Sequence, residues 1–435
     1  MEYILALGKE LGIKEIEVYS TKNTSLSIAV YNGKIDSTNK SVVEVVSIKG
    51  VYRGNVGRVS IENFDEKEIV HYLRSLIDNA KVVSVKEPAI LFKGAKKYQL
   101  SEAVVTDLNE TPLNKKMELV LNLDKALKGK TNVLQVQTSN YMESQVSVKI
   151  INTKGLNVSR ELAYCGMYSV GVFSKDGDIQ TAFEVEAKHN FKDLNTEKLA
   201  SKIAKIGNSK LGGSSMPSGN YPVVINNSAF GDLLNTFTSI FNGEMAFRGM
   251  SPLKGKENTV IGNELVSIYD DPFNKKALFT TPFDDEGVPC RKKAIVNKGV
   301  FTGFLQSLKS AKMNNVKPTG NGFRRGISPA GLTFQSGKTS HADLLVKAGN
   351  GVYITELQGL HAGVNQTSGN FSLQCNGFLI ENGVLGRPVK LIVLSGNFFK
   401  LLNEITAVGN DAKYEIQNGV TSPSVLIPSL AIGGQ

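Results

Sequence analysis

The chain has 435 residues, a formal net charge of +10, and a composition of 41% hydrophobic and 21% charged residues. These proportions are ordinary for globular proteins and exclude wholesale disorder, and at roughly 150 residues per domain the length predicts two large domains or three small ones. Glycine, at 42 residues, exceeds its usual share and favours tight turns and hairpins. Four histidines and three cysteines, far apart in the sequence, argue against a histidine-rich metal cluster or a disulfide scaffold.

Bulk features predict a cytoplasmic protein without a membrane segment. The chain begins MEYILALGKELG, with Glu2 where a signal peptide would carry positive charge, and no apolar run approaches the roughly 18 residues of a membrane helix. The cysteines have no CxxC spacing, as expected in a reducing compartment. Lysine is scattered along the chain rather than gathered in a stripe, which favours a solvated basic surface and argues against a nucleic-acid partner.

The first half of the chain mixes helix and strand patterns. Helices are expected over four stretches: 1–12, about 66–80, 112–128 and about 196–206. Alternating strand patterns lie between them. Asn32-Gly33 favours a hairpin, because both central positions of a type I′ turn need positive φ.

The segment KLGGSSMPSGNYP (210–222) is rich in Gly, Ser and Pro and predicts a domain boundary. After it, helix patterns are scarce apart from 228–243, where apolar residues recur at helical spacing. The predicted fold class is therefore α+β: a mixed N-terminal domain of helices and antiparallel hairpins (1–210), followed by a β-rich C-terminal domain (217–435).

Several local patterns come close to known sites without matching them. SGKTS (336–340) lacks the glycine that a phosphate-binding loop requires. A metal site built from His361, Cys375 and Cys290 is geometrically feasible, but buried inert thiols account better for the cysteines. The acidic run Asp284–Glu286 could bind a hard cation. Adjacent residues point in different directions, however, so a solvated acidic turn is expected there.

Six segments of the second half occur in one characteristic order. They are PSGNYPVV (217–224), FDDEGVPC (283–290), KPTGNGFRR (317–325), TSGNFSLQCNGFLIENG (367–383), RPVK (387–390) and AVGND (407–411). So ordered, they resemble the TldD/PmbA family, long labelled modulators of DNA gyrase and regarded as zinc-dependent peptidases. The resemblance is specific over 217–435, and the first half agrees with the family in length and in its order of helices and hairpins.

Members of this family differ at the metal site. TldD-like members carry HExxxH on the helix after the PSG…PVV strand and a cysteine close to the C-terminus. The histidines and the cysteine hold zinc, and the glutamate is the general base. In this chain the resemblance places Asn235 and Ile240 at the histidines and Thr236 at the glutamate. An amide is a poor zinc ligand, a threonine hydroxyl does not ionise near neutral pH, and isoleucine has no donor atom. The residues after Asp411 contain no cysteine.

These departures resemble the PmbA branch, also called TldE, which is the metal-free partner of a TldD-like protease. The resemblance implies no cofactor in this chain and zinc only in a TldD-like partner. It also implies that the paired enzyme processes or degrades unfolded peptides, such as microcin-type precursors and antitoxins. Extended peptides are thus the expected substrates, and Asn321, Gly322, Arg324 and His361 are the candidate peptide-cleft residues.

Because a family that pairs unlike subunits can also pair like ones, we expect a symmetric homodimer through the C-terminal domain when the chain is alone. Two other function classes stay open. One is a stand-alone hydrolase that does not use zinc, with residues around Asn321, Arg324 and Asp284–Glu286. The other is a binding protein that modulates gyrase or DNA.

Overall fold

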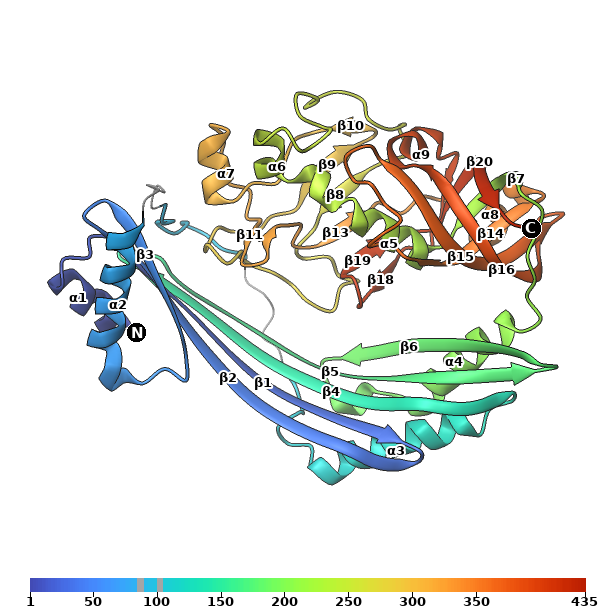
Figure 1. The fold of residues 1–435 in the computed structure, drawn as a ribbon, viewed down its shortest axis with the longest axis horizontal. Helices are drawn as coiled ribbons and strands as arrows, with labels where there is room; N and C mark the ends of the chain where they lie inside the picture. Colours follow the sequence, from blue (N-terminus) through green and yellow to red (C-terminus); the bar gives the residue numbers. More distant parts are fainter. Residues whose placement is uncertain (84–89, 100–104) are drawn as a thin grey trace.

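The first half of the chain forms one antiparallel sheet of six strands in the order β3-β2-β1-β4-β5-β6 (Figure 1). The computed structural model describes residues 1–83, 90–99 and 105–435. The strands are β1 (Ile16–Tyr31), β2 (Lys34–Tyr52), β3 (Asn55–Glu62), β4 (Val133–Asn152), β5 (Asn157–Lys175) and β6 (Asp178–Lys188). The expected hairpin at Asn32-Gly33 is confirmed: both residues have positive φ, 50° and 73°, and join β1 to β2.

Four helices cover one face of this sheet, two at each end. They are α1 (Glu2–Glu10), α2 (Ile69–Val82), α3 (Leu113–Lys128) and α4 (Thr196–Lys210). Alternate residues of a strand point to opposite faces. Accordingly, Val18 of β1 packs against α1 and α2, and Ile28, on the same face, packs against α3 and α4. Tyr19 lies on the other face and packs with Phe283 of the second half.

The second half contains two further sheets of six strands. One has the order β10-β9-β8-β13-β19-β18, and the other β16-β15-β14-β7-β20-β17. In the latter, an additional β16–β20 pairing closes β16, β15, β14, β7 and β20 into a barrel. The bounds are β7 (Gly219–Ile225), β8 (Ile268–Asp270), β9 (Lys293–Asn297), β10 (Val300–Phe301), β13 (Leu332–Phe334), β14 (Gly351–Gln358), β15 (Asn370–Glu381), β16 (Val384–Asn397), β17 (Ala407–Val408), β18 (Lys413–Glu415), β19 (Val420–Ser422) and β20 (Val425–Gly433).

Short helices and one small hairpin complete the second half. The helices are α5 (Asn227–Thr236), α6 (Gly243–Phe247), α7 (Leu308–Met313), α8 (His341–Ala348) and α9 (Phe398–Glu404), and the hairpin pairs β11 (Gly322–Phe323) with β12 (Gly326–Ile327). Among the described residues no helix is both long and apolar enough to cross a membrane. The mixed α+β class with a β-rich second half, as predicted, is confirmed.

The single helix expected over 228–243 is broken into three pieces. Helix α5 ends at Thr236, a 3₁₀ turn covers Thr238–Phe241, and α6 begins after Asn242, whose side chain accepts hydrogen bonds from Glu244 N and Met245 N. Phe237, at the break, stacks on Phe398 with ring centroids 4.2 Å apart. Packing against α9 and a second N-cap thus outweigh the helical spacing of the apolar residues.

The second half lies on the concave side of the N-terminal sheet, and α3 and α4 lie on its opposite side (Figure 1). Within the part of the chain that the structure describes, three ion pairs join the halves: Arg160–Asp285 at 2.7 Å, Lys210–Glu356 at 2.7 Å and Lys390–Asp178 at 2.6 Å. The last two lie beside the connection from α4 to β7, because the backbone N–H of Gly212 also bonds Asp178. The Arg160–Asp285 pair lies elsewhere, where the loop before β9 meets β1 and β5.

Candidate functional site

The residues that correspond to the zinc motif do not converge on a point. Asn235 is exposed in the last turn of α5. The Thr236 hydroxyl donates to the Asp232 carbonyl one turn earlier, at 2.8 Å. Ile240 lies beyond the end of the helix and is 2% exposed within the C-terminal core. A zinc site needs several donor atoms around one position, so these three residues do not fit the metal.

The loop between β14 and β15 closes over the end of α5. Gln366 donates to the Thr236 carbonyl at 2.6 Å and accepts a hydrogen bond from the Ser239 hydroxyl. His361 is exposed in the same loop. The loop therefore holds the break after α5 through Gln366, and His361 is left in contact with solvent.

The grouping of His361 with Cys290 and Cys375, feasible from the sequence but disfavoured, does not form a metal site. Within the described residues, no three His, Cys, Asp or Glu side chains are placed to hold a metal ion. Both cysteines are buried, Cys375 within the barrel and Cys290 with its thiol donating to the Gly320 carbonyl at 3.1 Å. Burial raises the pKa of Cys375 to about 12 and also raises that of Cys290. Both thiols therefore stay protonated and unreactive near neutral pH.

The expectation of a solvated acidic turn at Asp284–Glu286 is wrong. Asp284 is 0% exposed and accepts hydrogen bonds from the backbone N–H groups of Glu286, Val288 and Gly322 at 2.8–3.0 Å. Burial, and next the charge of Glu286, raise the pKa of Asp284 to about 7. Glu286 accepts from the Leu308 N–H at 2.7 Å. The side chains of Asp284 and Glu286 point in different directions, as expected for neighbours in a turn. Each accepts hydrogen bonds from backbone N–H groups, and these bonds hold the surrounding loops together.

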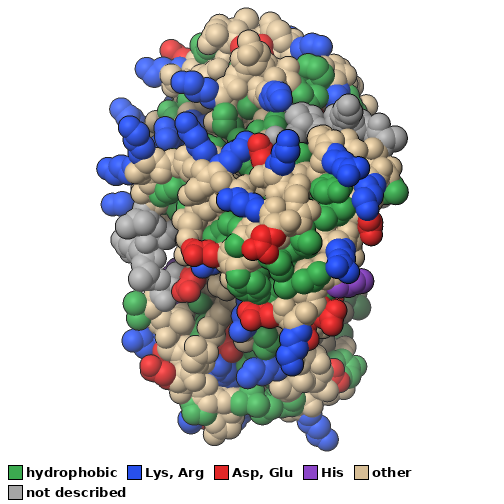
Figure 2. Space-filling view, turned by 90° about the vertical axis from the view of Figure 1, so that its left-hand side faces the viewer, with side chains coloured by type: hydrophobic (Ala, Val, Ile, Leu, Met, Phe, Trp, Pro, Cys, Tyr) green, Lys and Arg blue, Asp and Glu red, His purple; other side chains and the backbone are tan. Residues whose placement is uncertain are grey.

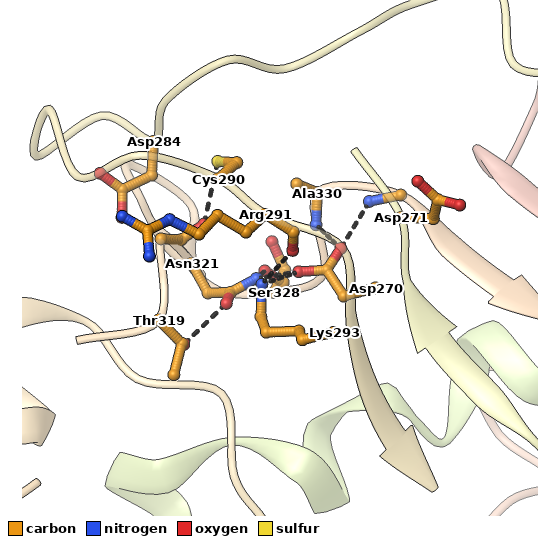
Figure 3. Close-up of polar contacts among 12 residues, drawn as sticks. Asp270, Asp271, Asp284, Cys290, Arg291, Lys293, Thr319, Asn321, Ser328 and Ala330 are labelled. Atoms are coloured by element: carbon orange, nitrogen blue, oxygen red, sulfur yellow. Dashed lines mark hydrogen bonds and ion pairs between the residues drawn. The ribbon is translucent and has the colours of Figure 1, made fainter. Parts of the chain in front are cut away.

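Asn321 belongs to a second buried cluster, centred on Asp270 (Figure 3). Both residues are 0% exposed, and the Asn321 amide donates to Asp270 at 2.7 Å and to the Ser328 carbonyl at 2.8 Å. Asp270 also pairs with Lys293 at 2.7 Å and accepts the N–H groups of Ala330 and Gly331, each at 2.8 Å. Every polar atom of this cluster is used internally, so it holds the β11–β12 hairpin in place.

The sequence prediction missed Asp270, because an acidic residue at the end of a short strand has no distinctive spacing. Its role depends on the donors that the fold brings to it: one lysine from β9 and the backbone of 330–331. A local pattern contains none of these partners.

Two adjacent pockets flank the β11–β12 hairpin, and Phe323 lines both. The first, of about 430 Å³, is lined by Gly322, Glu286 and Glu244 among others. The second, of about 350 Å³, is lined by Arg324 and Arg325 together with Asp285 and Ser328. Gly322 and Arg324 thus lie in pocket walls, Asn321 lies buried behind them, and His361 is not among the residues that line either pocket.

Gly322 is required by the packing of the first pocket. A Cβ at this position would lie 2.1 Å from a carboxylate oxygen of Glu286. In addition, the Gly322 N–H bonds Asp284. The residue therefore allows the hairpin to approach the acidic loop closely, and its role is steric.

Arg324 connects the hairpin to the N-terminal sheet. Its backbone N–H donates to Asp285 at 2.9 Å, and its guanidinium carbon lies 4.0 Å from the ring centroid of Tyr19 on β1. Asp285 is paired with Arg160 and accepts the Tyr19 hydroxyl at 3.2 Å. Burial, and next the charge of Asp285, raise the pKa of Tyr19 to about 12, so the phenol stays neutral. These contacts attach the wall of the second pocket, which is lined by residues of the second half, to the N-terminal sheet.

Positive charge is unevenly spread over one face of the molecule. On the face that includes α1 and α2, Lys and Arg side chains gather across the upper half, at the height of α6 and α7 (Figure 2). Arg248 directly follows α6 and Lys309 lies on α7, and both are exposed. Arg248 and Lys309 both contact Glu244, at 2.7 Å and 3.3 Å, so part of this charge is neutralised locally.

Two family models match most of the chain. Residues 218–434 match the PmbA/TldA metallopeptidase C-terminal domain, and residues 106–211 match the central domain of the same family. The Escherichia coli O157:H7 protein named Metalloprotease PmbA is 25% identical, over 99% of this chain and 94% of that protein.

Two solved structures are similar over their full length. The crystal structure of a Thermotoga maritima protein described as a modulator of a DNA gyrase is 32% identical, with a TM-score of 0.92 and 99% of each chain covered. TldE from Thermococcus kodakarensis has a TM-score of 0.90 and covers 100% of both chains; at 23% identity this is a similarity of fold alone.

Proposed function

The chain belongs to the PmbA/TldD family, and we propose that it is the metal-free, TldE-like subunit of a TldD–TldE-type metallopeptidase that acts on unfolded peptides. One observation carries the proposal. The family fold is kept along the chain, yet the positions of the zinc motif hold an exposed amide (Asn235) and a hydroxyl bonded to its own helix (Thr236) at the end of α5, and a core isoleucine (Ile240) in the turn that follows. Such a helix cannot assemble a zinc-bound water.

On this proposal, the zinc and the general base come from a TldD-like subunit. This chain would contribute scaffold and peptide-binding surface, and it would carry no cofactor of its own. Microcin-type precursors and antitoxins are the substrate classes that the family resemblance suggests. In the absence of the partner, the chain would pair with a second copy of itself.

A free sheet edge supports the binding of extended peptides. Strand β3 pairs with β2 only over Val45–Tyr52, so Lys34–Glu44 of β2 has no strand on its outer side among the described residues. Val42 and Val43 on this edge are 54% and 43% exposed. An open edge offers backbone donors and acceptors to an extended chain without demanding a particular sequence.

Co-expression with a TldD-like protein from the same source tests the proposal. We expect the two chains to co-purify, and we expect the complex to hydrolyse an unfolded peptide faster than the TldD-like subunit alone, with all activity lost after chelation of zinc. Separate purification of the two chains, with no change in the partner's peptidase activity, would contradict the proposal.

Assays of the isolated chain separate the two other function classes. Peptide hydrolysis by this chain alone, surviving chelation, would indicate the stand-alone hydrolase. The burial of Asn321 and Asp284 argues against that outcome, because neither side chain can reach a substrate without unfolding its surroundings. Tight, salt-dependent DNA binding by the isolated chain would indicate the nucleic-acid role.

A further inference from the structure

The second pocket beside the β11–β12 hairpin contains positive charge that the protein itself does not neutralise. Its wall includes Arg324 and Arg325, and both are exposed. Neither guanidinium makes a hydrogen bond or ion pair to any residue that the structure describes. The one acidic residue in the wall, Asp285, is already paired with Arg160 at 2.7 Å.

Two contacts fix the position of Arg324. Its guanidinium stacks on Tyr19 at 4.0 Å, while its backbone N–H is fixed by Asp285. Stacking on a ring occupies the face of the guanidinium and leaves the N–H groups at its edge free to donate. Less side-chain entropy is then lost when a ligand binds.

The base of the hairpin is equally fixed. Asn321 and Gly322, which precede the two arginines, are held by Asp270 and Asp284 through the buried bonds described above. The opposite wall, Ser328 to Ala330, is held by the same Asp270 cluster, through Asn321 and the Ala330 N–H. The pocket is therefore rigid on both sides.

A larger cavity among the described residues lacks this feature. The cavity of about 590 Å³ between β6, α4 and the second half has four lysines in its wall. Two of them are paired within the cavity, Lys202 with Glu184 and Lys413 with Glu415, each at 2.6 Å. The other two, Lys210 and Lys390, form the ion pairs that join the two halves. Its charges are thus balanced internally, unlike those of the arginine pocket.

We propose that the pocket formed by Arg324, Arg325 and Ser328 at the junction of the two halves binds a carboxylate of an extended peptide. The planar edge of an arginine matches a carboxylate with two parallel hydrogen bonds. Phe323 and Pro329 in the wall offer apolar contact to the rest of a residue, and about 350 Å³ accommodates a group of that size. The carboxylate belongs to an Asp or Glu side chain or to the C-terminus of the peptide. The inference rests on the proposed peptide-binding function and names its preferred substrate.

Binding of short, fluorescein-labelled unstructured peptides to the full-length chain, measured by fluorescence anisotropy, tests the site. Three peptides of equal length share one sequence. One has acidic side chains and an amidated end, one has neutral amide side chains and a free C-terminal carboxylate, and one has neither charge. We expect at least one charged peptide to bind about tenfold more tightly than the uncharged one, and which of the two does so identifies the source of the carboxylate.

Arg324→Gln should remove that tenfold preference, and Arg324→Lys should restore only part of it, because lysine cannot form the two-pronged contact. Arg53→Gln is the matched control, since Arg53 also lies over a tyrosine ring, at 5.4 Å from Tyr52, in the β2–β3 hairpin. It should leave binding unchanged. Circular dichroism of each variant checks that the fold is kept.

Equal binding of the three peptides, or an Arg324→Gln variant that keeps the preference, would overturn the inference. So would tighter binding of single-stranded DNA than of any peptide, with a steep salt dependence. Failure of the carboxylate site would leave association with a TldD-like subunit untouched. Failure of that association, with the Arg324-dependent preference intact, would instead count against the proposed function.

Discussion

Asn321 has no exposed surface, and its amide is bonded to Asp270, Ser328 and Thr319 at 2.7–2.8 Å. An asparagine beside two glycines and two arginines is typical of a ligand-binding loop, which is why the sequence favours it as a cleft residue. In the fold its side chain is buried beneath the surface, and its hydrogen bonds fix the loop that carries Arg324 and Arg325. The identity of a residue in a loop does not reveal whether its side chain points outward or into the protein.

Asn321→Ala should therefore lower stability. The substitution removes one of the donors to buried Asp270 and the amide donor to the Ser328 carbonyl, which typically costs about 2–4 kcal/mol in the free energy of unfolding. Urea denaturation measures this quantity. Asn39→Ala, at an exposed position of β2, is the control and should change it by less than about 0.5 kcal/mol. A full-stability Asn321→Ala variant would show that the cluster is not structural.

Asp284 should make stability depend on pH. Its pKa is about 7 in the folded chain, raised from 3.8 chiefly by burial, so between pH 4 and 7 the folded state binds a proton that the unfolded state releases. The contribution of Asp284 to stability is then greatest below pH 4, falls as pH rises towards 7 and levels off above it.

Urea denaturation between pH 5 and 8 tests this expectation. The wild type should lose about 1–3 kcal/mol more than Asp284→Asn over the rise from pH 5 to 7. Asp36→Asn, at an exposed position, should follow the wild type. Parallel curves for the wild type and Asp284→Asn would contradict the assignment.

Among the secondary-structure elements, the end of helix α5 determines whether the positions of the zinc motif can share one metal ion. The helix stops at Thr236 because Phe237 packs on Phe398 and Asn242 caps a new helix, so Asn235 and Ile240 do not share a helix face. The HExxxH spacing brings its two histidines to one face only if the helix is continuous over the whole motif. Restoring histidines alone should not restore a metal site here.

Ile240→His should destabilise the chain without creating a zinc site. The isoleucine is 2% exposed in the core, so an imidazole there loses apolar burial and gains an unpaired polar group, at a cost of about 2–5 kcal/mol. Asn235→His, on the exposed last turn, should change stability by less than about 0.5 kcal/mol. Urea denaturation and zinc titration of the double variant check both statements, and stoichiometric tight zinc binding would refute them.

Much of the fold follows from local sequence. The turn at Asn32-Gly33, the amphipathic helices of the first half and the β-rich character of the second are each specified by periodicity and turn residues over short stretches. The break inside 228–243 and the burial of Asp284 depend on Phe398, Gly322 and the other residues that approach from afar. Tertiary contacts of this kind have no local signature, which is why a continuous helix and a solvated acidic turn were expected.

The candidate site was predictable only in part. Family motifs indicate the departures at Asn235, Thr236 and Ile240 without any structure. The pocket around Arg324 depends on Tyr19 and Arg160, which lie more than a hundred residues away in the sequence and meet Asp285 only because the second half packs on the concave face of the sheet.

At the scale of the whole molecule, the isolated chain should form a symmetric homodimer through its second half. Light scattering during size-exclusion chromatography should give twice the chain mass of 47.1 kDa. Adding a TldD-like subunit during expression should convert this species to a heteromeric complex. A chain that stays monomeric at every concentration would contradict the homodimer.

The zinc content of the separated subunits, measured after co-expression and purification of the complex, tests the central claim most directly. We expect zinc in the TldD-like subunit and none above background in this chain. Stoichiometric zinc bound to this chain would contradict it, because the described residues offer no donor set at Asn235, Thr236 and Ile240 that could hold the metal.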